Sequence, residues 1–248
     1  MRSRATEQLC YTIAMRFIVT AGPTREHLDP VRFLSNPSTG RMGFAVARAA
    51  REAGHEVTLV AGPVALKTPR GVRRVDVVSA RDMLAAVLSE TGQRAKDGGQ
   101  RTVLVMTAAV ADWRPARCAK RKMKKGEMSG TLKLVRNPDI LKAVNRMAAR
   151  TGTAGGPPVA SGTASPIRIG FAAETGVPDA EAARKCREKG LALVVGNDVT
   201  RHDSGFGAAT NRVTFVTPDG RAQRLPLMSK LAVARRIVSF AERIASNG

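Results

Sequence analysis

Short apolar runs that end in small residues alternate with segments of helical periodicity along most of this chain. "RFIVTAG" (16–22) and "RTVLVMTAAVAD" (101–112) are typical of buried strands, whereas "GRMGFAVARAAREAG" (40–54) places apolar side chains at the spacing of a helix. Such alternation produces a parallel sheet that is covered by helices on both faces. We therefore expect an α/β, Rossmann-like fold of three layers.

Other segments continue the same alternation. The expected strands are 55–63, 72–80, 131–137, 167–175 and 191–198, and the expected helices are 80–92, 138–150, 179–190 and 229–245. Residues 211–227 place a Pro-Asp-Gly turn between two alternating runs. They predict a small β-hairpin, to which we assign a role in dimerisation.

The chain is expected to form one domain over residues 15–248. Residues 1–14 precede the first strand without a structural pattern, and we expect a disordered extension there. Residues 113–130 are basic and lack both helical and strand periodicity, which predicts a mobile flap. Residues 151–166 are rich in Gly, Pro, Ser and Thr, so they predict a flexible loop.

The charge of the chain narrows the classes of partner. A net charge of +21 favours phosphate-bearing ligands, but only 4% of residues are aromatic, which argues against a base-stacking nucleic-acid surface. No apolar run is long enough to span a membrane, and the N-terminus does not resemble a signal peptide. Three scattered cysteines suit reduced thiols. We expect a cytoplasmic protein without nucleic-acid or membrane partners.

The segment between the first strand and the first helix is the strongest candidate for a binding site. Ligands of open parallel sheets bind beyond the carboxyl ends of the strands, and this segment follows such an end. Its "SNPSTGRMG" stretch offers Asn36, the hydroxyls of Ser38 and Thr39, and the backbone of Gly40 and Gly43 to a phosphate. The alternative is that the two glycines only allow close packing of helix on strand.

Three further segments combine a candidate site position with useful chemistry. Thr107 and Ala108 are small residues that let a ligand approach the backbone, and Asp112 is the first carboxylate after them, although an Asp there is often only a turn residue. The basic run "KRKMKK" suits either a solvated loop or a flap over phosphates. Phe171 suits either the core or a nucleobase stack.

Two lysines of the expected helix 179–190 extend this set. Lys185 and Lys189 are four residues apart and share one helix face. They suit either solvent exposure or a clamp on phosphates. No Cys, His, Asp and Glu spacing indicates a zinc site.

Taken in order, "TAGPTREHLDPVRFLSNPSTGRMG", "AAVADWRP", "KRKMKK", "NPDIL", "GFAAET" and "GNDVT" resemble the phosphopantothenate–cysteine ligase family of coenzyme A biosynthesis. The resemblance covers roughly residues 16 to 244. In many bacteria this ligase is the C-terminal half of a bifunctional flavoprotein. The sequence before Met15 is too short for the flavin-dependent half, so the chain resembles a stand-alone ligase and no flavin is expected.

The resemblance implies an activity in two steps. The carboxylate of 4′-phosphopantothenate attacks the α-phosphate of CTP, releases pyrophosphate and gives an acyl-cytidylate. The amine of L-cysteine then displaces CMP. The resemblance implies Mg²⁺, held mainly by the nucleotide phosphates and with metal ligands unknown, and a homodimer. The choice of CTP over ATP stays open from residue types alone.

The resemblance also implies roles for individual residues. Asn36 holds the carbonyl of the intermediate, and Lys122 of the flap acts on the phosphates. The implied substrate- and nucleotide-binding residues are Ser38, Thr39, Gly40, Gly43, Met106, Thr107, Ala108, Asp112, Asn137, Pro138, Asp139, Ile140, Phe171, Lys185 and Lys189. Asp112 is implied to serve the site across a dimer interface.

The chain departs from the family pattern at Pro23, at the "PST" that follows Asn36, at Trp113 and in "GFGAATN". An NAD(P)- or flavin-binding Rossmann oxidoreductase is the alternative that the fold alone suggests. It lacks a G-x-G-x-x-G turn after the first strand, and "TLVAGP" at the end of the second strand carries no acidic residue.

Overall fold

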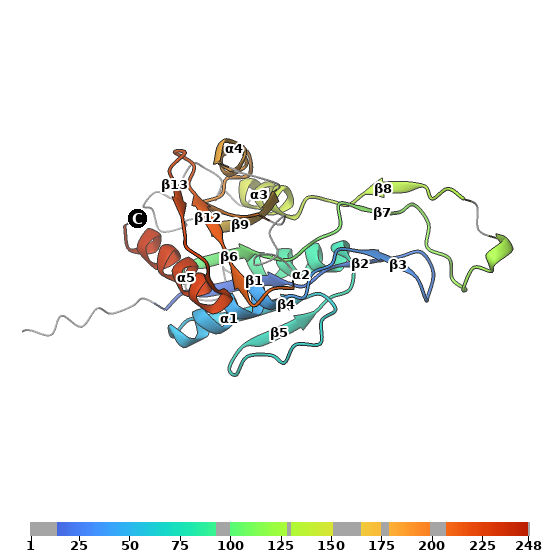
Figure 1. Cartoon of the computed structure of the whole chain (residues 1–248), viewed down its shortest axis with the longest axis horizontal. Helices are drawn as coiled ribbons and strands as arrows, with labels where there is room; N and C mark the ends of the chain where they lie inside the picture. The colour runs from blue at the N-terminus through green and yellow to red at the C-terminus, as the bar shows by residue number, and fades with distance from the viewer. Residues whose placement is uncertain are drawn as a thin grey trace, which may run out of the picture.

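The computed structural model describes residues 14–92, 100–127, 130–150, 165–174, 179–198 and 207–247. One eight-stranded sheet forms its centre, in the order β13-β12-β10-β9-β6-β1-β4-β5 (Figure 1). Its strands are β1 (Arg16–Ala21), β4 (Glu56–Ala61), β5 (Arg73–Asp76), β6 (Thr102–Met106), β9 (Ile167–Glu174), β10 (Leu193–Asp198), β12 (Val213–Val216) and β13 (Ala222–Arg224).

Within the described ranges, five α-helices cover the two faces of this sheet. They are α1 (Arg41–Glu52), α2 (Ala80–Gly92), α3 (Ile140–Arg150), α4 (Asp179–Lys189) and α5 (Lys230–Ser246). Helices α1 and α5 pack together on one face, while α3 packs between α2 and α4 on the other. None of the helices in the described ranges is long and apolar enough to cross a membrane.

Successive side chains of the central strand β1 point alternately to the two faces of the sheet. Phe17, Val19 and Ala21 of β1 belong to the cluster beneath α1 and α5, whereas Ile18 between them belongs to the cluster beneath α2, α3 and α4. All four side chains are fully buried. The apolar runs of the sequence are therefore strands that are buried on both faces, which is typical of a parallel sheet between helix layers.

The expected three-layer architecture is confirmed, with one refinement. Strands β5, β4, β1, β6, β9 and β10 are parallel, but β12 pairs antiparallel with β10, and β13 pairs antiparallel with β12. The hairpin expected within 211–227 thus exists as β12 and β13. It extends the main sheet instead of standing apart from it.

Some expected boundaries were wrong. Strand β6 ends at Met106, because the chain from Thr107 onwards turns toward the end of β1. Helix α3 begins at Ile140, because Asp139 caps it.

The basic segment 113–130 is not wholly irregular, since it begins with strand β7 (Trp113–Pro115) and contains a 3-10 turn, η2 (Lys125–Glu127). Residues 1–13 and 151–164 lie outside the described residues.

A two-layered arm, which the sequence did not predict, extends from the carboxyl edge of the sheet (Figure 1). It consists of the antiparallel pair β2 (Arg25–His27) and β3 (Phe33–Ser35) and the antiparallel pair β7 and β8 (Leu134–Arg136). Strand β2 contacts β7. Only β8 lies within an expected strand, 131–137, whereas β2, β3 and β7 are too short to show a recognisable period.

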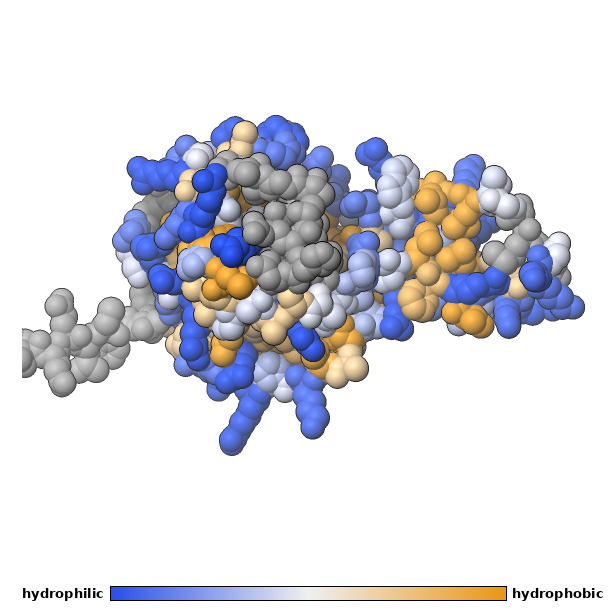
Figure 2. Space-filling model, viewed as in Figure 1, coloured by the Kyte–Doolittle hydropathy of each residue, from blue (hydrophilic) through white to orange (hydrophobic). Residues whose placement is uncertain are grey.

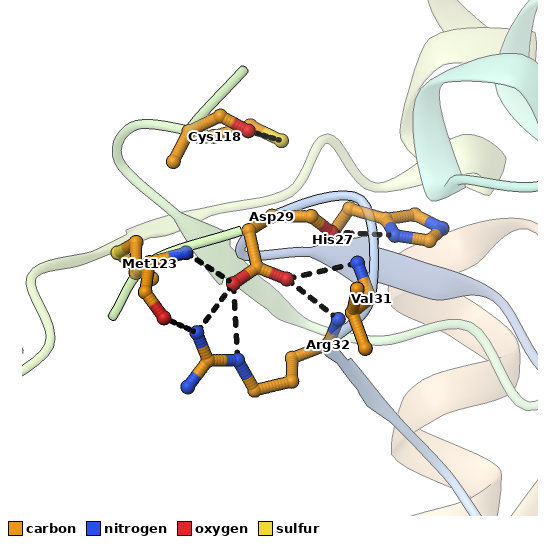
Figure 3. Close-up of polar contacts among 7 residues, drawn as sticks. His27, Asp29, Val31, Arg32, Cys118 and Met123 are labelled. Atoms are coloured by element: carbon orange, nitrogen blue, oxygen red, sulfur yellow. Dashed lines mark hydrogen bonds and ion pairs between the residues drawn. The ribbon is translucent and has the colours of Figure 1, made fainter. Parts of the chain in front are cut away.

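A buried carboxylate at Asp29 joins the two layers of the arm (Figure 3). Its Oδ1 accepts hydrogen bonds from the backbone N–H groups of Val31 and Arg32 at 2.9 and 2.8 Å. Its Oδ2 accepts from Arg32 Nε and Nη2 at 3.0 and 2.5 Å and from the backbone N–H of Met123 at 3.2 Å. Arg32 Nη2 also donates to the Met123 carbonyl at 2.8 Å. The residue after Lys122 is therefore fixed to the β2–β3 turn.

The glycine at position 43 decides how closely α1 approaches the sheet. A Cβ at Gly43 would lie 2.5 Å from Ala21 Cβ and from Thr107 Oγ1, and 2.8 Å from the Thr20 carbonyl oxygen. We predict that Gly43→Ala lowers the free energy of unfolding by about 1–3 kcal/mol, although alanine is normally the better helix residue. Urea unfolding measures this.

Gly92→Ala in α2 is the matched control, because a Cβ there meets only Met147 Sδ at 3.9 Å. It should leave stability unchanged or raise it by up to about 1 kcal/mol. Equal effects of the two substitutions would contradict the packing constraint at position 43.

We predict that Asp29→Asn loosens the segment that carries Lys122 while the sheet stays folded. The Arg32 side chain and three backbone N–H groups hold the pKa of Asp29 well below its ordinary value against the opposing effect of burial. Because the folded-state pKa is lowered, the stability that this anchor contributes is fully present above pH ~4, declines below that, and is gone only once the pH falls through the lowered pKa of Asp29. Faster hydrogen exchange at the Met123 amide, and faster tryptic cleavage after Arg121 and Lys122, would measure the loosening.

Asp76→Asn is the control, because the exposed carboxylate of Asp76 belongs to the edge strand β5 and pairs with Arg74 of the same strand. It should leave exchange at Met123 unchanged. If Asp29→Asn also leaves that exchange at the wild-type rate at pH 7, the anchor does not hold the segment.

Candidate active site

The candidate site lies where the strand order reverses. Strand β1 has β4 on one side and β6 on the other, so the connections after β1 and after β6 leave toward opposite faces of the sheet. These connections are nevertheless tied to each other just beyond the strands. The Ala109 N–H donates to the Gly22 carbonyl at 2.9 Å, and the Ala111 N–H donates to Thr24 Oγ1 at 3.0 Å.

A cavity of about 560 Å³ opens at this edge of the sheet. Most of the residues that the sequence singled out line it, although they come from four separate parts of the chain. The predicted residues in its wall are Asn36, Ser38, Thr39, Gly40, Gly43, Met106, Thr107, Ala108, Asp112, Phe171, Lys185 and Lys189.

A second cavity of about 440 Å³ adjoins the first. Met106, Asp112 and Lys189 line both cavities. The predicted residues that line only the second cavity are Asn137, Pro138, Asp139 and Ile140. The two cavities together have room for two extended substrates that meet near the shared residues.

The glycine-containing turn presents the N-terminus of α1 to the first cavity. Gly40 is the N-cap residue with a φ of 76°, a left-handed conformation that favours glycine, and no acidic residue lies in the first turn. The positive end of the helix therefore faces the cavity without a carboxylate of its own. Gly43 meets the packing requirement described above and also lines the cavity, while its contact with a phosphate stays a prediction.

Asn36 is held against the loop that follows β6. Its Nδ2 donates to the carbonyls of Ala109 and Val110, both at 3.2 Å. The amide is exposed, and this pair of bonds fixes its position at the edge of the cavity. A carboxylate in its place would face two carbonyl oxygens and lose both bonds.

The lysines of α4 reach the cavity as members of ion pairs. Lys189 Nζ lies 3.1 Å from Asp139 Oδ2, and Lys185 Nζ lies 3.9 Å from Glu181 Oε1. Burial alone would raise the pKa of Asp139, but the Lys142 N–H and the Lys189 ammonium outweigh it and hold that pKa below its ordinary value. An anionic ligand in the cavity would compete with these carboxylates for the two ammonium groups.

Asn137 has a structural task at the base of the arm. Its Nδ2 donates to the Ala111 carbonyl at 2.8 Å, its Oδ1 accepts from Arg114 Nη1 at 3.1 Å, and its backbone N–H donates to the Asp112 carbonyl at 2.8 Å. These bonds join the loop after β6 to the start of α3. The exposed side chain of Asp112 is held between the two cavities by this connection.

Lys122 is the predicted residue that the structure does not bring into either cavity. It is exposed on the arm beyond β7, next to the anchored Met123. Its expected contact with phosphates is therefore absent from this arrangement of the chain and stays a prediction.

Four polar residues in the wall of the first cavity were not predicted: Arg41, Asn197, Asn211 and Lys230. Arg41 begins α1 and Lys230 begins α5, so both lie at helix N-termini that face the cavity. Three of them had a signal in the sequence: Arg41 lies beside the glycines, Asn197 lies in "GNDVT" and Asn211 ends "GFGAATN". Lys230 is far from every other site residue along the chain, and nothing in its local pattern points to a ligand.

Comparison of the sequence with known proteins identifies relatives of this chain. The Coenzyme A biosynthesis bifunctional protein CoaBC of Vibrio vulnificus (strain YJ016) is 40% identical over 223 residues, which are 89% of this chain and 50% of that protein. CoaBC of Bacillus subtilis (strain 168) is 43% identical over 222 residues, 89% of this chain and 49% of that protein. The chain thus spans about half the length of these relatives.

Comparison with solved structures identifies CoaBC again, together with a second protein of the same fold. The crystal structure of the C-terminal domain of CoaBC superposes with a TM-score of 0.71 at 39% identity and covers 95% of this chain and 99% of that one. A Cab2 mutant in complex with phosphopantothenate-cysteine has a TM-score of 0.69 at 15% identity, covering 94% of this chain and 88% of that one, and supports the fold.

A family model matches residues 13–244, nearly the whole chain. Its description is "DNA/pantothenate metabolism flavoprotein C-terminal domain". The match includes the cavity, the arm and every residue that was expected to form the site. The chain therefore belongs to the family of the DNA/pantothenate metabolism flavoprotein C-terminal domain.

Proposed function

We propose that this chain is a phosphopantothenate–cysteine ligase that joins 4′-phosphopantothenate and L-cysteine at the expense of CTP. The observation that carries the proposal is the convergence of its site residues. Residues that follow β3, residues at and after the end of β6, residues within β9, the N-terminus of α1 and residues of α4 line one cavity. Family membership and the likeness to CoaBC support the same activity. They do not favour the oxidoreductase alternative.

The cavity suits the activation of a carboxylate by a nucleotide. A carboxylate oxygen attacks the α-phosphorus, the bond from that phosphorus to the bridging oxygen breaks, and pyrophosphate leaves with the electron pair. The cysteine amine then attacks the acyl carbon, CMP leaves, and the amine loses a proton. The N-terminus of α1 and the lysines of α4 would hold the phosphates, and the partly buried Phe171 offers a ring for the base.

Asn36 is proposed to hold the carbonyl of the acyl-cytidylate. Its amide nitrogen now donates to the Ala109 and Val110 carbonyls, so one of these two bonds would be exchanged for a bond to the substrate carbonyl while the other keeps the amide oriented. Lys122 is proposed to approach the phosphates when substrate is bound. An ammonium group there stabilises the charge that develops on the leaving oxygen.

Mg²⁺ is proposed to enter with the nucleotide. Mg²⁺ prefers oxygen ligands and often keeps contacts to substrate phosphates. Asp112 is the one carboxylate that the described residues place in the wall of the first cavity, so it is the side chain available to such an ion. The ion would neutralise triphosphate charge, and most of its ligands would be phosphate oxygens.

The proposed reaction involves no flavin. The enzyme is proposed to act in the cytoplasm.

A homodimer is proposed, with the arm as its contact surface. The large apolar side chains exposed on the arm are Val31, Phe33, Trp113, Leu132 and Leu134. Figure 2 shows a broad hydrophobic area on the arm, between charged regions. An exposed apolar area of this kind is typical of a protein interface. The hairpin of β12 and β13, which was expected to serve dimerisation, exposes every side chain of β13, and these are Ala222, Gln223 and Arg224.

We predict that pyrophosphate release depends on 4′-phosphopantothenate and CTP but not on cysteine in the first turnover. The carboxylate is the first nucleophile, and cysteine is needed only to release CMP. Quenched-flow measurement of pyrophosphate with each substrate omitted in turn tests this order. Release that is independent of phosphopantothenate would contradict the proposed function.

We predict that Lys122→Gln and Asn36→Asp each lower kcat by on the order of 100-fold or more, since each removes a charged or hydrogen-bonding group from the transition state. Lys120→Gln is the matched control, because Lys120 is also exposed on the arm. It should retain near wild-type kcat. Similar losses for Lys120→Gln and Lys122→Gln would show that the arm contributes only general positive charge.

A further inference from the structure

Thr24 is a fully buried polar residue where the arm joins the sheet. It lies between the end of β1 and the start of β2. On one side of it, the Gly22 carbonyl accepts a hydrogen bond from the Ala109 N–H at 2.9 Å. On the other side, the Arg25 N–H donates to the Val78 carbonyl at 2.8 Å. The backbone is therefore fixed on both sides of Thr24.

The hydroxyl of Thr24 and the amide of Asn36 hold opposite ends of one peptide group. Thr24 Oγ1 accepts a hydrogen bond from the Ala111 N–H at 3.0 Å. That N–H shares its peptide group with the Val110 carbonyl, which accepts from Asn36 Nδ2 at 3.2 Å. The peptide bond is trans, so its N–H and its C=O point in opposite directions within one plane. A bond that fixes the direction of the Ala111 N–H thus also fixes the direction of the Val110 carbonyl.

Thr24 also contacts the residue that precedes Asn36. Ser35 Oγ donates to the Thr24 carbonyl at 2.8 Å, and Ser35 lies opposite Arg25 in the pairing of β2 with β3. Through its hydroxyl, Thr24 is bonded to the loop that supplies the acceptors of the Asn36 amide. Through its carbonyl, it is bonded to the strand that carries Asn36 itself. One residue therefore sets the spacing between the two.

The orientation of Asn36 depends on how firmly its acceptors are held. Its side chain is exposed, and its bonds to the Ala109 and Val110 carbonyls are both 3.2 Å long, at the long end of the usual range. Neighbouring hydrogen bonds in a chain polarise and strengthen one another. The chain from Thr24 through the Val110–Ala111 peptide group therefore strengthens the bond between Asn36 and the Val110 carbonyl.

We propose that Thr24 is a positioning residue, which orients the amide of Asn36 through the Val110–Ala111 peptide group. This role rests on the proposed function, which places the carbonyl of the acyl-cytidylate at Asn36. The bond to Val110 keeps the amide aligned, while the bond to Ala109 is exchanged for the substrate carbonyl. Thr24 does not line either cavity, so it acts only through these partners.

Thr24→Val tests this role, because it preserves the shape of the side chain and leaves the Ala111 N–H without its acceptor. We expect kcat to fall about tenfold or more, since a small misplacement of a group that holds the reacting centre is costly. The KM for CTP should change by less than about twofold, because the phosphates are proposed to bind elsewhere in the cavity. Thr24→Ser keeps the hydroxyl and should restore most of kcat.

Thr102→Val is the matched control. Thr102 is also a buried threonine, but it lies at the start of β6, and its Oγ1 has no hydrogen-bond partner among the described residues. The substitution should leave kcat at the wild-type value. Equal losses of kcat in Thr24→Val and Thr102→Val would overturn the proposal, because any buried threonine would then have the same effect.

A double-mutant cycle separates positioning from a general structural effect. If Thr24 acts through Asn36, adding Thr24→Val to Asn36→Ala should lower kcat by less than about a further twofold. A loss in the double variant equal to the product of the two single losses would overturn the proposal.

Nuclear magnetic resonance observes the Asn36 amide without catalysis. Its two Nδ2–H signals, assigned by their loss in Asn36→Ala, should shift toward those of a free amide in Thr24→Val. Ser35→Ala, at an exposed position that is safe for folding, should shift them in the same direction, and Thr102→Val should not. Unchanged Asn36 signals in Thr24→Val would overturn the proposal. Should the signals shift as expected while the wild-type chain shows no phosphopantothenate-dependent release of pyrophosphate, the positioning of Asn36 would stand and the proposed function would fail.

Discussion

The site depends on the close approach of helix α1 to strand β1. Gly43 has no side chain, and any Cβ there would collide with Ala21, Thr107 and the Thr20 carbonyl. Thr107 Oγ1 donates to that same carbonyl at 2.5 Å, so the end of β6 is tied to the place where α1 packs. One contact thereby sets the position of the helix N-terminus and of the loop after β6, which form two sides of the cavity.

The remaining walls come from the reversal of strand order between β1 and β6. It sends one set of helices to each face, so that α4 contributes Lys185 and Lys189 from one side and α5 contributes Lys230 from the other. The positive groups that surround the cavity are therefore distributed among helices that are distant in the sequence. Their convergence explains how a strongly basic chain concentrates charge where an anionic ligand would bind.

The arm is stabilised differently from the sheet. Its strands are short, its large apolar residues are exposed, and the buried Asp29 carboxylate links its two layers through Arg32 and Met123. Such a segment has few buried apolar contacts, so it belongs to the parts of a fold that open at the lowest free energy. The proposed roles of the arm, in dimerisation and in bringing Lys122 to phosphates, both suit a segment whose position is set by polar contacts.

The sequence by itself determined the layered α/β fold, because runs such as 16–22 and 40–54 carry strand and helix periods strong enough to be recognised locally. The sequence also identified most residues of the cavity wall. The carboxyl ends of parallel strands meet at one edge of a sheet, so residues near those ends were expected to lie together. Only the tertiary structure revealed the arm, in which β2, β3 and β7 are too short to show a period, and the incorporation of β12 and β13 into the main sheet. The location of Lys230 in the cavity wall also depends on the tertiary structure. Its burial and its bond to Asn211 come from the pairing of β11 (Thr210–Asn211) with β14 (Met228–Ser229) and from the packing of α5 on α1. Local periodicity specifies elements, whereas the charges that meet in a cavity depend on contacts between segments that no local pattern records.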